Sequence, residues 1–189
     1  LGTMSLKEIT NPGDPDLVEL YDNVLKTCFP LDLLELKEIQ KALQDSIDGK
    51  FGDGKYHIIV IKNKNNEIVA GCSFSFVVDE SKTGVSFGVD EYFAVLPAYR
   101  RYSIGTTIVA LRLKILNRDA KQLGLRHVKY LLGEYQDEKR MTKAQIEKEG
   151  FDPIARKRFW KKAHMRTLDF DFKKPQSLHD LRKIEQAYT

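Results

Sequence analysis

Residues 91–106 decide the fold, and they read EYFAVLPAYRRYSIGT. A strand that ends at Val95 is followed by Pro97, which cannot extend a strand ladder, and then by a basic turn that leads into a helix. The first turn of a helix presents unpaired backbone N–H groups and a partial positive charge. Ser103 and Gly105 are small enough for a ligand to approach those groups, and two adjacent arginines add positive charge. The segment therefore predicts a binding site for an anion.

The chain on either side of this segment predicts a mixed sheet. Runs rich in β-branched and aromatic residues are separated by short turns, which indicates consecutive antiparallel strands. A helix over 103–123, ended by Gly124, then leads to a further strand, and a helical connection makes the two strands that it joins parallel. The predicted strands of this region are 57–62, 67–78, 85–95 and 126–132.

The two ends of the chain add helices and outer strands. Asp14 is placed to cap a helix that has Pro15 at its first position and ends before Phe29. The other predicted elements are a strand over 5–9, a helix over 32–47, a partly helical polar stretch over 134–150, a helix from Asp152 to Lys162, a strand over 166–172 and a final helix in the tail 173–189. This order predicts a single α/β domain (α+β layered) over 4–172, in which helices cover both faces of a mostly antiparallel mixed sheet.

The composition is that of a globular protein in a reducing compartment. Of 189 residues, 42% are apolar and 31% are charged, and no apolar run approaches the ~20 residues that span a bilayer, so no membrane partner is expected. Cys28 and Cys72 are the only cysteines, which gives no disulfide framework and favours the cytoplasm. The net charge of +4 comes from basic residues interleaved with 27 acidic ones, which argues against nucleic acid as a partner. We interpret Leu1–Thr3, which precede Met4, as a remnant of recombinant expression.

Residues 91–106 resemble the cofactor motif of the GNAT N-acetyltransferase superfamily, V-x-P-x-Y-R-x-x-G-x-G/A, which follows the fourth strand of that fold. Ser103 departs from the motif, because the family usually has its first glycine there. A second, looser match is RFWKKAHMR at 158–166, which resembles the family's later F-Y-x-K-x-G-F-R element. The residues that match the first motif are Val95, Pro97, Tyr99, Arg100 and Gly105.

The resemblance implies the fold of that family and acetyl-CoA as a co-substrate. Backbone groups of the fourth strand would then bind the pantetheine arm, and N–H groups at the start of the following helix would hold the pyrophosphate. The residues implied for the cofactor are Phe93, Ala94, Val95, Arg100, Arg101, Tyr102, Ser103, Ile104, Gly105 and Thr106. The four histidines have no metal-ligand spacing, so no metal is expected.

Acetyl transfer to an amine requires a base, because a free alkylamine has a pKa of about 10.4. Glu91 is the first candidate, since several family members carry a glutamate on the fourth strand. Period-2 alternation predicts that Glu91 shares a strand face with Phe93 and Val95. Glu134 and Asp90 are the rival carboxylates.

The general acid is less clear from the sequence. Trp160 stands where the family often has a tyrosine, and its indole N–H is not an acid at physiological pH. Tyr135 is a weak substitute, with Tyr92 and Tyr130 as further alternatives.

The resemblance therefore implies an enzyme that transfers acetyl from acetyl-CoA to a primary amine by direct attack on the thioester. A small-molecule amine is favoured over an amino group of a protein. The alternative is a module of the same fold that binds or senses acyl-CoA without turnover. Dimers are common in the family, so a homodimer stays open, and the sequence does not decide it.

Overall fold

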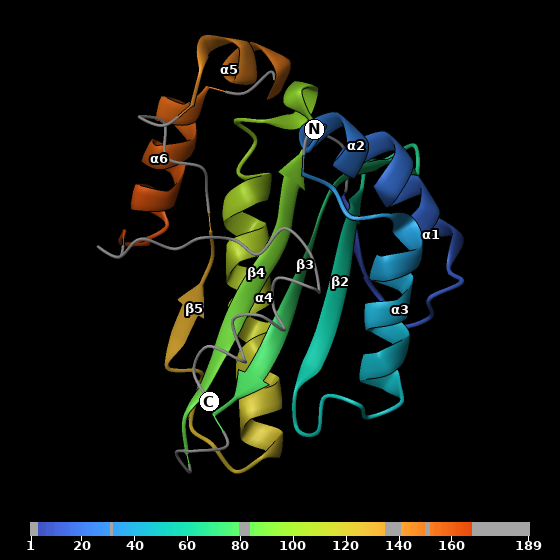
Figure 1. Ribbon diagram of the computed structural model, residues 1–189, viewed down its shortest axis with the longest axis vertical. Coiled ribbons are helices and arrows are strands. Elements are labelled where there is room, and N and C mark those ends of the chain that lie inside the picture. The colour runs from blue at the N-terminus through green and yellow to red at the C-terminus, as the bar shows by residue number, and fades with distance from the viewer. Residues whose placement is uncertain (1–3, 31, 80–83, 135–140, 150–151, 168–189) are drawn as a thin grey trace, which may run out of the picture.

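The computed structural model describes residues 4–30, 32–79, 84–134, 141–149 and 152–167, which form a central sheet covered by helices (Figure 1). The strands are β1 (Ser5–Ile9), β2 (Lys55–Lys62), β3 (Ile68–Val78), β4 (Ser86–Val95) and β5 (Tyr130–Leu132). The α-helices are α1 (Pro15–Glu19), α2 (Lys26–Cys28), α3 (Leu36–Ile47), α4 (Ile104–Gln122), α5 (Lys143–Glu149) and α6 (Pro153–Lys162). A π-helical segment, η1 (Leu20–Leu25), joins α1 to α2, and a 3-10 turn, η2 (Pro97–Tyr99), precedes α4.

The sheet has the predicted mixed topology. Its strands follow the order β1-β2-β3-β4-β5, with antiparallel pairs except for the parallel pair β4–β5. Strand β5 pairs with β4 only where Tyr130–Leu132 lies against Phe87–Val89. Within the described residues, the rest of β4, Asp90–Val95, has no strand beside it on that edge. The two strands therefore part at Val89, and Figure 1 shows β5 beside only one end of β4.

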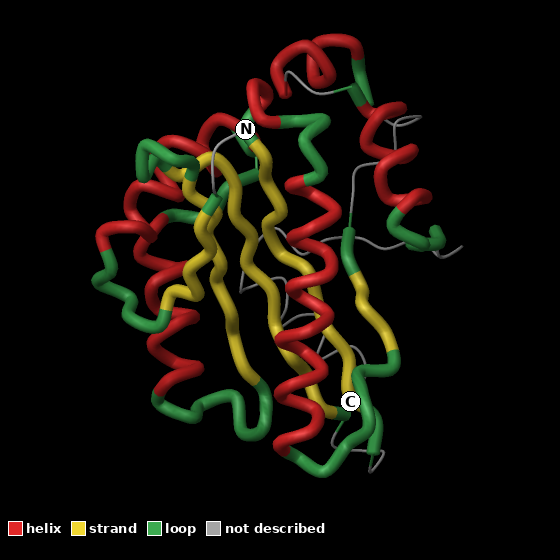
Figure 2. Tube along the Cα trace, turned by 180° about the vertical axis from the view of Figure 1, so that it is seen from behind, coloured by secondary structure: helices red, strands yellow, loops and turns green. Residues whose placement is uncertain are grey.

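Helices cover both faces of the sheet, as predicted. Figure 2 shows α4 in front of the strands, and Figure 1 shows it behind them. The core on the α4 side includes Ile108 and Leu116 of α4 packed with Phe74 of β3. The core on the other side, which we call the α1–α3 side, includes Leu20 and Leu43 packed with β2. None of the helices in the described part of the chain is long and apolar enough to cross a membrane.

Two predicted boundaries are wrong for physical reasons. Helix α3 begins at Leu36 rather than at Asp32, because Glu35 and Glu38 form a capping box there. The preceding loop is held instead by Tyr92, whose hydroxyl accepts a hydrogen bond from the backbone N–H of Leu34 at 2.9 Å.

Strand β5 is also shorter than predicted, because the N–H of Val128 donates to the side chain of Asn117 at 2.9 Å and not to β4. The N–H of Lys129 donates to the carbonyl of Ser86, the first residue of β4, at 2.7 Å, and the strand begins at the next residue. The predicted helix cap at Asp14 is confirmed. Most of the predicted strand 166–172 and all of the tail 173–189 lie outside the described residues.

Candidate active site

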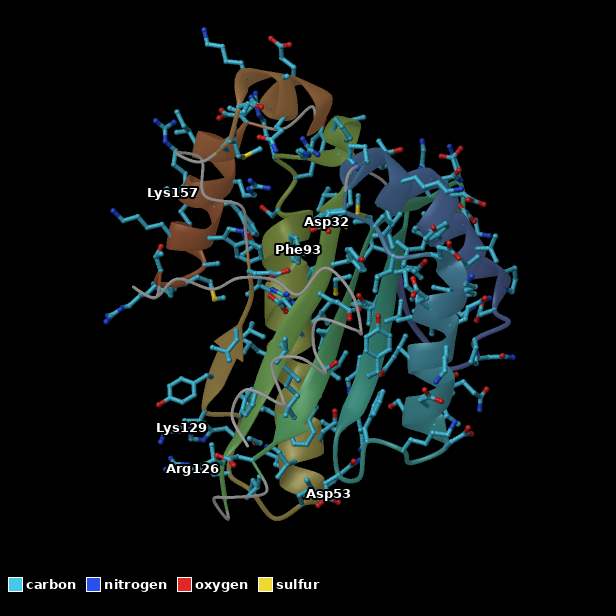
Figure 3. The ribbon with its side chains drawn as sticks, viewed as in Figure 1. Asp32, Asp53, Phe93, Arg126, Lys129 and Lys157 are labelled. Carbon is cyan, nitrogen blue, oxygen red and sulfur yellow. The ribbon has the colours of Figure 1, made fainter. Side chains whose placement is uncertain are left out.

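Strands β4 and β5 separate beyond Val89, and we call this region the split. On its α4 side lie the aromatic side chains of Phe93, Phe159 and Trp160, which we call the aromatic wall. Phe93, from the unpaired half of β4, lies at its centre (Figure 3). Helix α6 brings two rings against Phe93, with centroid distances of 5.6 Å to Phe159 and 5.2 Å to Trp160. The second matching motif of the sequence therefore packs against the first, although about 60 residues separate them in the chain.

The turn before α4 has a backbone suited to an anion. Arg101 and Ser103 have φ angles of 73° and 62°, in the left-handed region. The first hydrogen bond of the helix joins the N–H of Thr107 to the carbonyl of Ser103 at 2.9 Å, and no side chain of the described residues caps the N–H groups before it. Backbone N–H groups in such a turn, at the positive end of a helix dipole, bind phosphate groups. Serine in this conformation costs ~1–2 kcal/mol, which explains the preference for glycine at this place of the motif.

Gly105 is in close contact with α6. A Cβ built at this position would lie 3.0 Å from Cε2 and 3.1 Å from Cζ of Phe159. A side chain at this position would require the Phe159 ring to move by a few tenths of an ångström, so Gly105 serves the packing of α6 as well as access to the backbone.

We expect the Gly105→Ala variant to bind coenzyme A about tenfold more weakly than the wild type. The added methyl group must displace either the Phe159 ring or the N–H groups of the turn, and overpacking of this kind costs ~1–3 kcal/mol. Isothermal titration calorimetry with coenzyme A measures the change. A Gly105→Ala/Phe159→Leu double variant should recover affinity, whereas unchanged affinity in the single variant would mean that coenzyme A binds elsewhere.

The two arginines of the turn have different surroundings. The Nε of Arg100 donates to the backbone carbonyl of Val95 at 3.0 Å, so its guanidinium turns back toward the end of β4. Arg101 is exposed and follows it in the left-handed conformation. Both arginines were predicted to place charge beside the helix start. The guanidinium of Arg100 is bonded to the end of β4, and the role of Arg101 stays a prediction.

The face predicted for Glu91 is wrong, because β4 has a bulge at this residue. The register passes from Ser73 opposite Tyr92 to Phe74 opposite Asp90, which leaves Glu91 as the extra residue. Its Oε2 accepts hydrogen bonds from the hydroxyl of Tyr56 and, at 3.2 Å, from that of Ser73. Tyr56 belongs to the core on the α1–α3 side, so Glu91 faces that side and not the aromatic wall.

A buried ion pair lies where β4 leaves β5. Arg112 of α4 is 0% exposed and pairs with Asp90, the first residue of the unpaired edge. Its guanidinium carbon is 4.8 Å from the ring centroid of Phe93 and 5.9 Å from that of Trp160. Burial raises the pKa of Asp90, although the guanidinium opposes the shift. Helical periodicity could have indicated this burial, because Arg112 lies four residues from both Ile108 and Leu116 on the apolar stripe of α4.

Glu134 and Trp160, at the places of the rival base and of the family's acid, have different surroundings. Glu134 is exposed and directly follows Gly133, where an added Cβ would lie 3.3 Å from Oδ2 of Asp90. Tyr135 lies outside the described residues. Trp160 is in a ring cluster, with its centroid 4.9 Å from that of Phe159. Within the described ranges, no cluster of three or more His, Cys, Asp or Glu side chains has an arrangement that could hold a metal ion.

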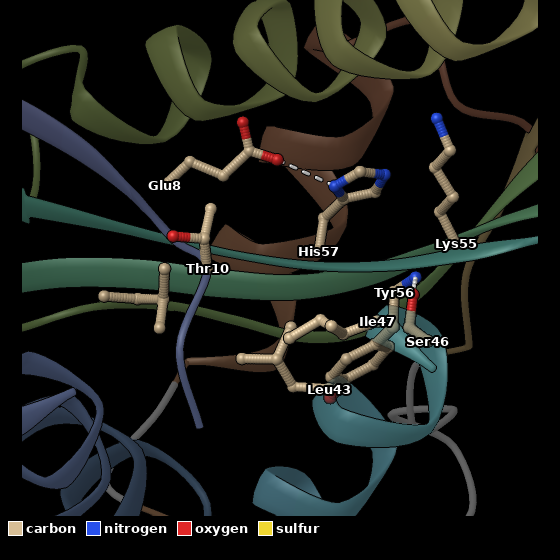
Figure 4. Close-up of a pocket in the computed structure, with 9 residues that line it drawn as sticks. Glu8, Thr10, Leu43, Ser46, Ile47, Lys55, Tyr56 and His57 are labelled. Carbon is tan, nitrogen blue, oxygen red and sulfur yellow. Dashed lines mark hydrogen bonds and ion pairs between the residues drawn. The ribbon is translucent and has the colours of Figure 1, made fainter. Parts of the chain in front are cut away.

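A separate pocket of about 230 Å³ lies between α3 and the end of β1 (Figure 4). The Nδ1 of His57 is 2.8 Å from Oε1 of Glu8, and its Nε2 is 2.8 Å from Oδ2 of Asp119. Lys55 also pairs with Asp119, at 3.2 Å. An imidazolium donates from both nitrogens, which suits the two carboxylates. These charges neutralise one another and join β1, β2 and α4, so we interpret the cluster as structural.

This cluster predicts a window of maximal stability in pH. Burial opposes the charge of His57, but the bonds to Asp119 and Glu8 outweigh it and raise the pKa of His57 above 6.5. The bond from His57 is the main reason that the pKa of Glu8 is lowered from 4.5 to about 2. The contribution of His57 to the free energy of unfolding is complete below pH 6.5 and is lost as pH rises through the folded pKa of His57. The contribution of Glu8 is complete above pH 4.5 and is lost as pH falls toward 2.

Urea denaturation across this range checks the prediction. The free energy of unfolding should be highest between pH 4.5 and 6.5 and should fall on the alkaline side. The His57→Gln variant, which cannot titrate, should lack the alkaline fall. A wild-type curve that is flat from pH 6.5 upward would contradict the ion-paired state of His57.

Comparisons with known proteins agree with this geometry. A comparison with curated protein sequences gives no match. Among solved structures, the chain is similar to an aminoglycoside acetyltransferase from an uncultured soil metagenomic sample, with 12% identity, a TM-score of 0.61 and coverage of 92% of this chain and 97% of that one. It is also similar to glucosamine-6-phosphate N-acetyltransferase from Arabidopsis thaliana, with 14% identity, a TM-score of 0.57 and coverage of 93% and 99%. At such identities the likeness shows the fold alone.

The sequence itself identifies the family. The model of the acetyltransferase (GNAT) family matches residues 18–142, which include the whole sheet from β2 to β5 and the turn before α4. The resemblance inferred from residues 91–106 is thereby confirmed, and so is the fold class. This chain belongs to the GNAT family of acetyltransferases.

Proposed function

We propose that this protein transfers the acetyl group of acetyl-CoA to a primary amine. The observation that carries the proposal is the uncapped turn before α4 next to the unpaired edge of β4. The turn suits the pyrophosphate of coenzyme A, held by the N–H groups of residues 101–106. The free edge, at Phe93–Val95, offers backbone groups to the two amides of the pantetheine arm.

The proposed chemistry needs one protein base. Bound acetyl-CoA supplies the thioester whose carbonyl carbon the amine attacks. Glu91 takes a proton from the amine, directly or through water, so that the nitrogen lone pair is free to form the C–N bond. The C–S bond breaks and coenzyme A leaves as a thiolate, which has a pKa near ~8.5 and needs no dedicated acid. Trp160, packed among aromatic rings, is therefore not required to donate a proton.

We propose a small molecule as the acceptor. Two of the similar structures are acetyltransferases for aminoglycosides and for glucosamine-6-phosphate, which are small amines. The alternative function, a module that binds acyl-CoA without turnover, is favoured by one observation: Trp160, at the place of the family's acid, is held between Phe93 and Phe159.

Incubation with acetyl-CoA and a panel of amines tests the proposal. The panel should contain aminoglycosides, amino sugars, polyamines and a lysine peptide, and a thiol reagent should follow the release of coenzyme A. We expect thiol release that depends on the amine. A protein that binds acetyl-CoA and releases no thiol with any amine would be the binding module.

A further inference from the structure

The carboxylate of Glu91 is held by two neighbouring strands. Tyr56 comes from β2 and Ser73 from β3, and both hydroxyls donate to the same oxygen, Oε2. Glu91 is nevertheless an exposed residue, and no hydrogen bond to its Oε1 is found among the described residues. One oxygen is therefore fixed and the other is accessible.

Tyr56 is suited to a permanent role as a donor. Its ring is buried in the core on the α1–α3 side, and its backbone N–H donates to the hydroxyl of Ser46 at the end of α3, at 2.8 Å. Burial, and then the charge of Glu91, raises the pKa of the Tyr56 hydroxyl well above its usual range. The hydroxyl therefore keeps its proton throughout the pH range of an enzyme assay, and it donates to the carboxylate without competing for the proton that a base takes up.

The bulge and the hydrogen bonds from Tyr56 and Ser73 together decide which side of β4 the carboxylate of Glu91 faces. The opposite side of β4 is closed by Phe93 and the rings of α6. On the α1–α3 side lies the loop 32–34, which Tyr92 holds by accepting from the N–H of Leu34 and donating to the carbonyl of Asp32 at 3.3 Å (Figure 3). The exposed carboxylate and this loop lie on the same face of the sheet as α3.

We propose that Tyr56 and Ser73 are positioning residues for Glu91, and that they present Oε1 to an amine that enters from the α1–α3 side. This inference rests on the proposed function. Neither residue touches the reacting atoms. Both act by holding the carboxylate in one orientation, so that its other oxygen stays available to accept a proton.

The split between kcat and KM distinguishes positioning from a merely structural role. A carboxylate that can rotate presents Oε1 to the amine in fewer of its conformations, so loss of a donor should lower kcat for the best amine. In Tyr56→Phe kcat should fall about tenfold, because the free energy of a charge-assisted hydrogen bond corresponds to about tenfold in an equilibrium. In Ser73→Ala kcat should fall by less, since the bond from Ser73 is the longer of the two. The KM for acetyl-CoA should stay within about twofold, because neither residue lies at the helix start.

Ser75→Ala is the matched control. It changes a serine two residues along the same strand and on the same face as Ser73, and no hydrogen bond joins Ser75 to Glu91 in the described part of the chain. It should leave kcat unchanged. Circular dichroism establishes that each variant is folded. If Tyr56→Phe does not fold, Ser73→Ala still tests the inference.

The outcomes separate this inference from the proposed function. If Glu91→Gln keeps the wild-type rate, the base is wrong and the proposed mechanism fails with it. If Glu91→Gln loses activity while kcat stays at the wild-type value in folded Tyr56→Phe and Ser73→Ala, only the positioning role is overturned. A kcat that falls in these two variants with the KM for acetyl-CoA retained, and that does not fall in Ser75→Ala, supports it.

Discussion

The Glu91→Gln variant is expected to lose about 10²-fold or more in kcat/KM for the best amine, because glutamine keeps the shape of the side chain and cannot accept the proton. The affinity for acetyl-CoA should be unchanged, since Glu91 lies on the α1–α3 side and the uncapped turn lies at the start of α4. Glutamine can still accept hydrogen bonds from Tyr56 and Ser73, so the local structure should persist.

Steady-state kinetics with the wild type and Glu134→Gln alongside completes the experiment. Glu134 is the rival carboxylate at the end of β5, and its replacement should have a much smaller effect. The reverse order of effects would assign the base to Glu134. A Glu91→Gln rate equal to that of the wild type, with turnover present, would show that the amine arrives already deprotonated.

The Arg112→Met variant is expected to lower the free energy of unfolding by about 3–5 kcal/mol at neutral pH, because it leaves the carboxylate of Asp90 buried without its partner. The loss should be smaller in acid. With the guanidinium gone, Asp90 is protonated in the folded state at a pH where the unfolded chain is ionised, so stability falls as pH rises toward that folded pKa. Urea denaturation at two pH values, one acidic and one neutral, measures both effects.

The Asp90→Val/Arg112→Met double variant is the control for this pair. It removes both charges and fills the space with apolar atoms, and such replacements of buried pairs are often neutral or stabilising. Most of the lost stability should therefore return. A single variant within about 0.5 kcal/mol of the wild type would show that the pair does not hold α4 to β4.

The parts of the site that follow from local sequence were predicted well. The end of β4, the turn and the start of α4 are consecutive in the chain, and Pro97, two residues after the end of the strand, begins the 3-10 turn. The capping pattern at Asp14 and the helix start at Pro153 are likewise local, and both are as predicted.

The parts that depend on distant contacts were not predicted. A bulge is a mismatch between two strands, so the alternation of β4 alone put Glu91 on the wrong face. Tyr56 and Ser73 reach Glu91 only because three strands lie side by side. Arg112 lies on the apolar stripe of α4, four residues from both Ile108 and Leu116. Its partners, Asp90 and a ring of α6, are distant in the sequence, so the ion pair was not predicted.

Calorimetric titration of the intact chain with acetyl-CoA and with free coenzyme A bears most directly on the assignment. The uncapped N–H groups before α4 should give one saturable site, with a Kd between roughly 1 μM and 1 mM, as for typical enzyme substrates. Binding should weaken in Gly105→Ala and persist in Glu91→Gln. Heats no larger than those of dilution for every coenzyme A species, with the protein folded, would contradict the account.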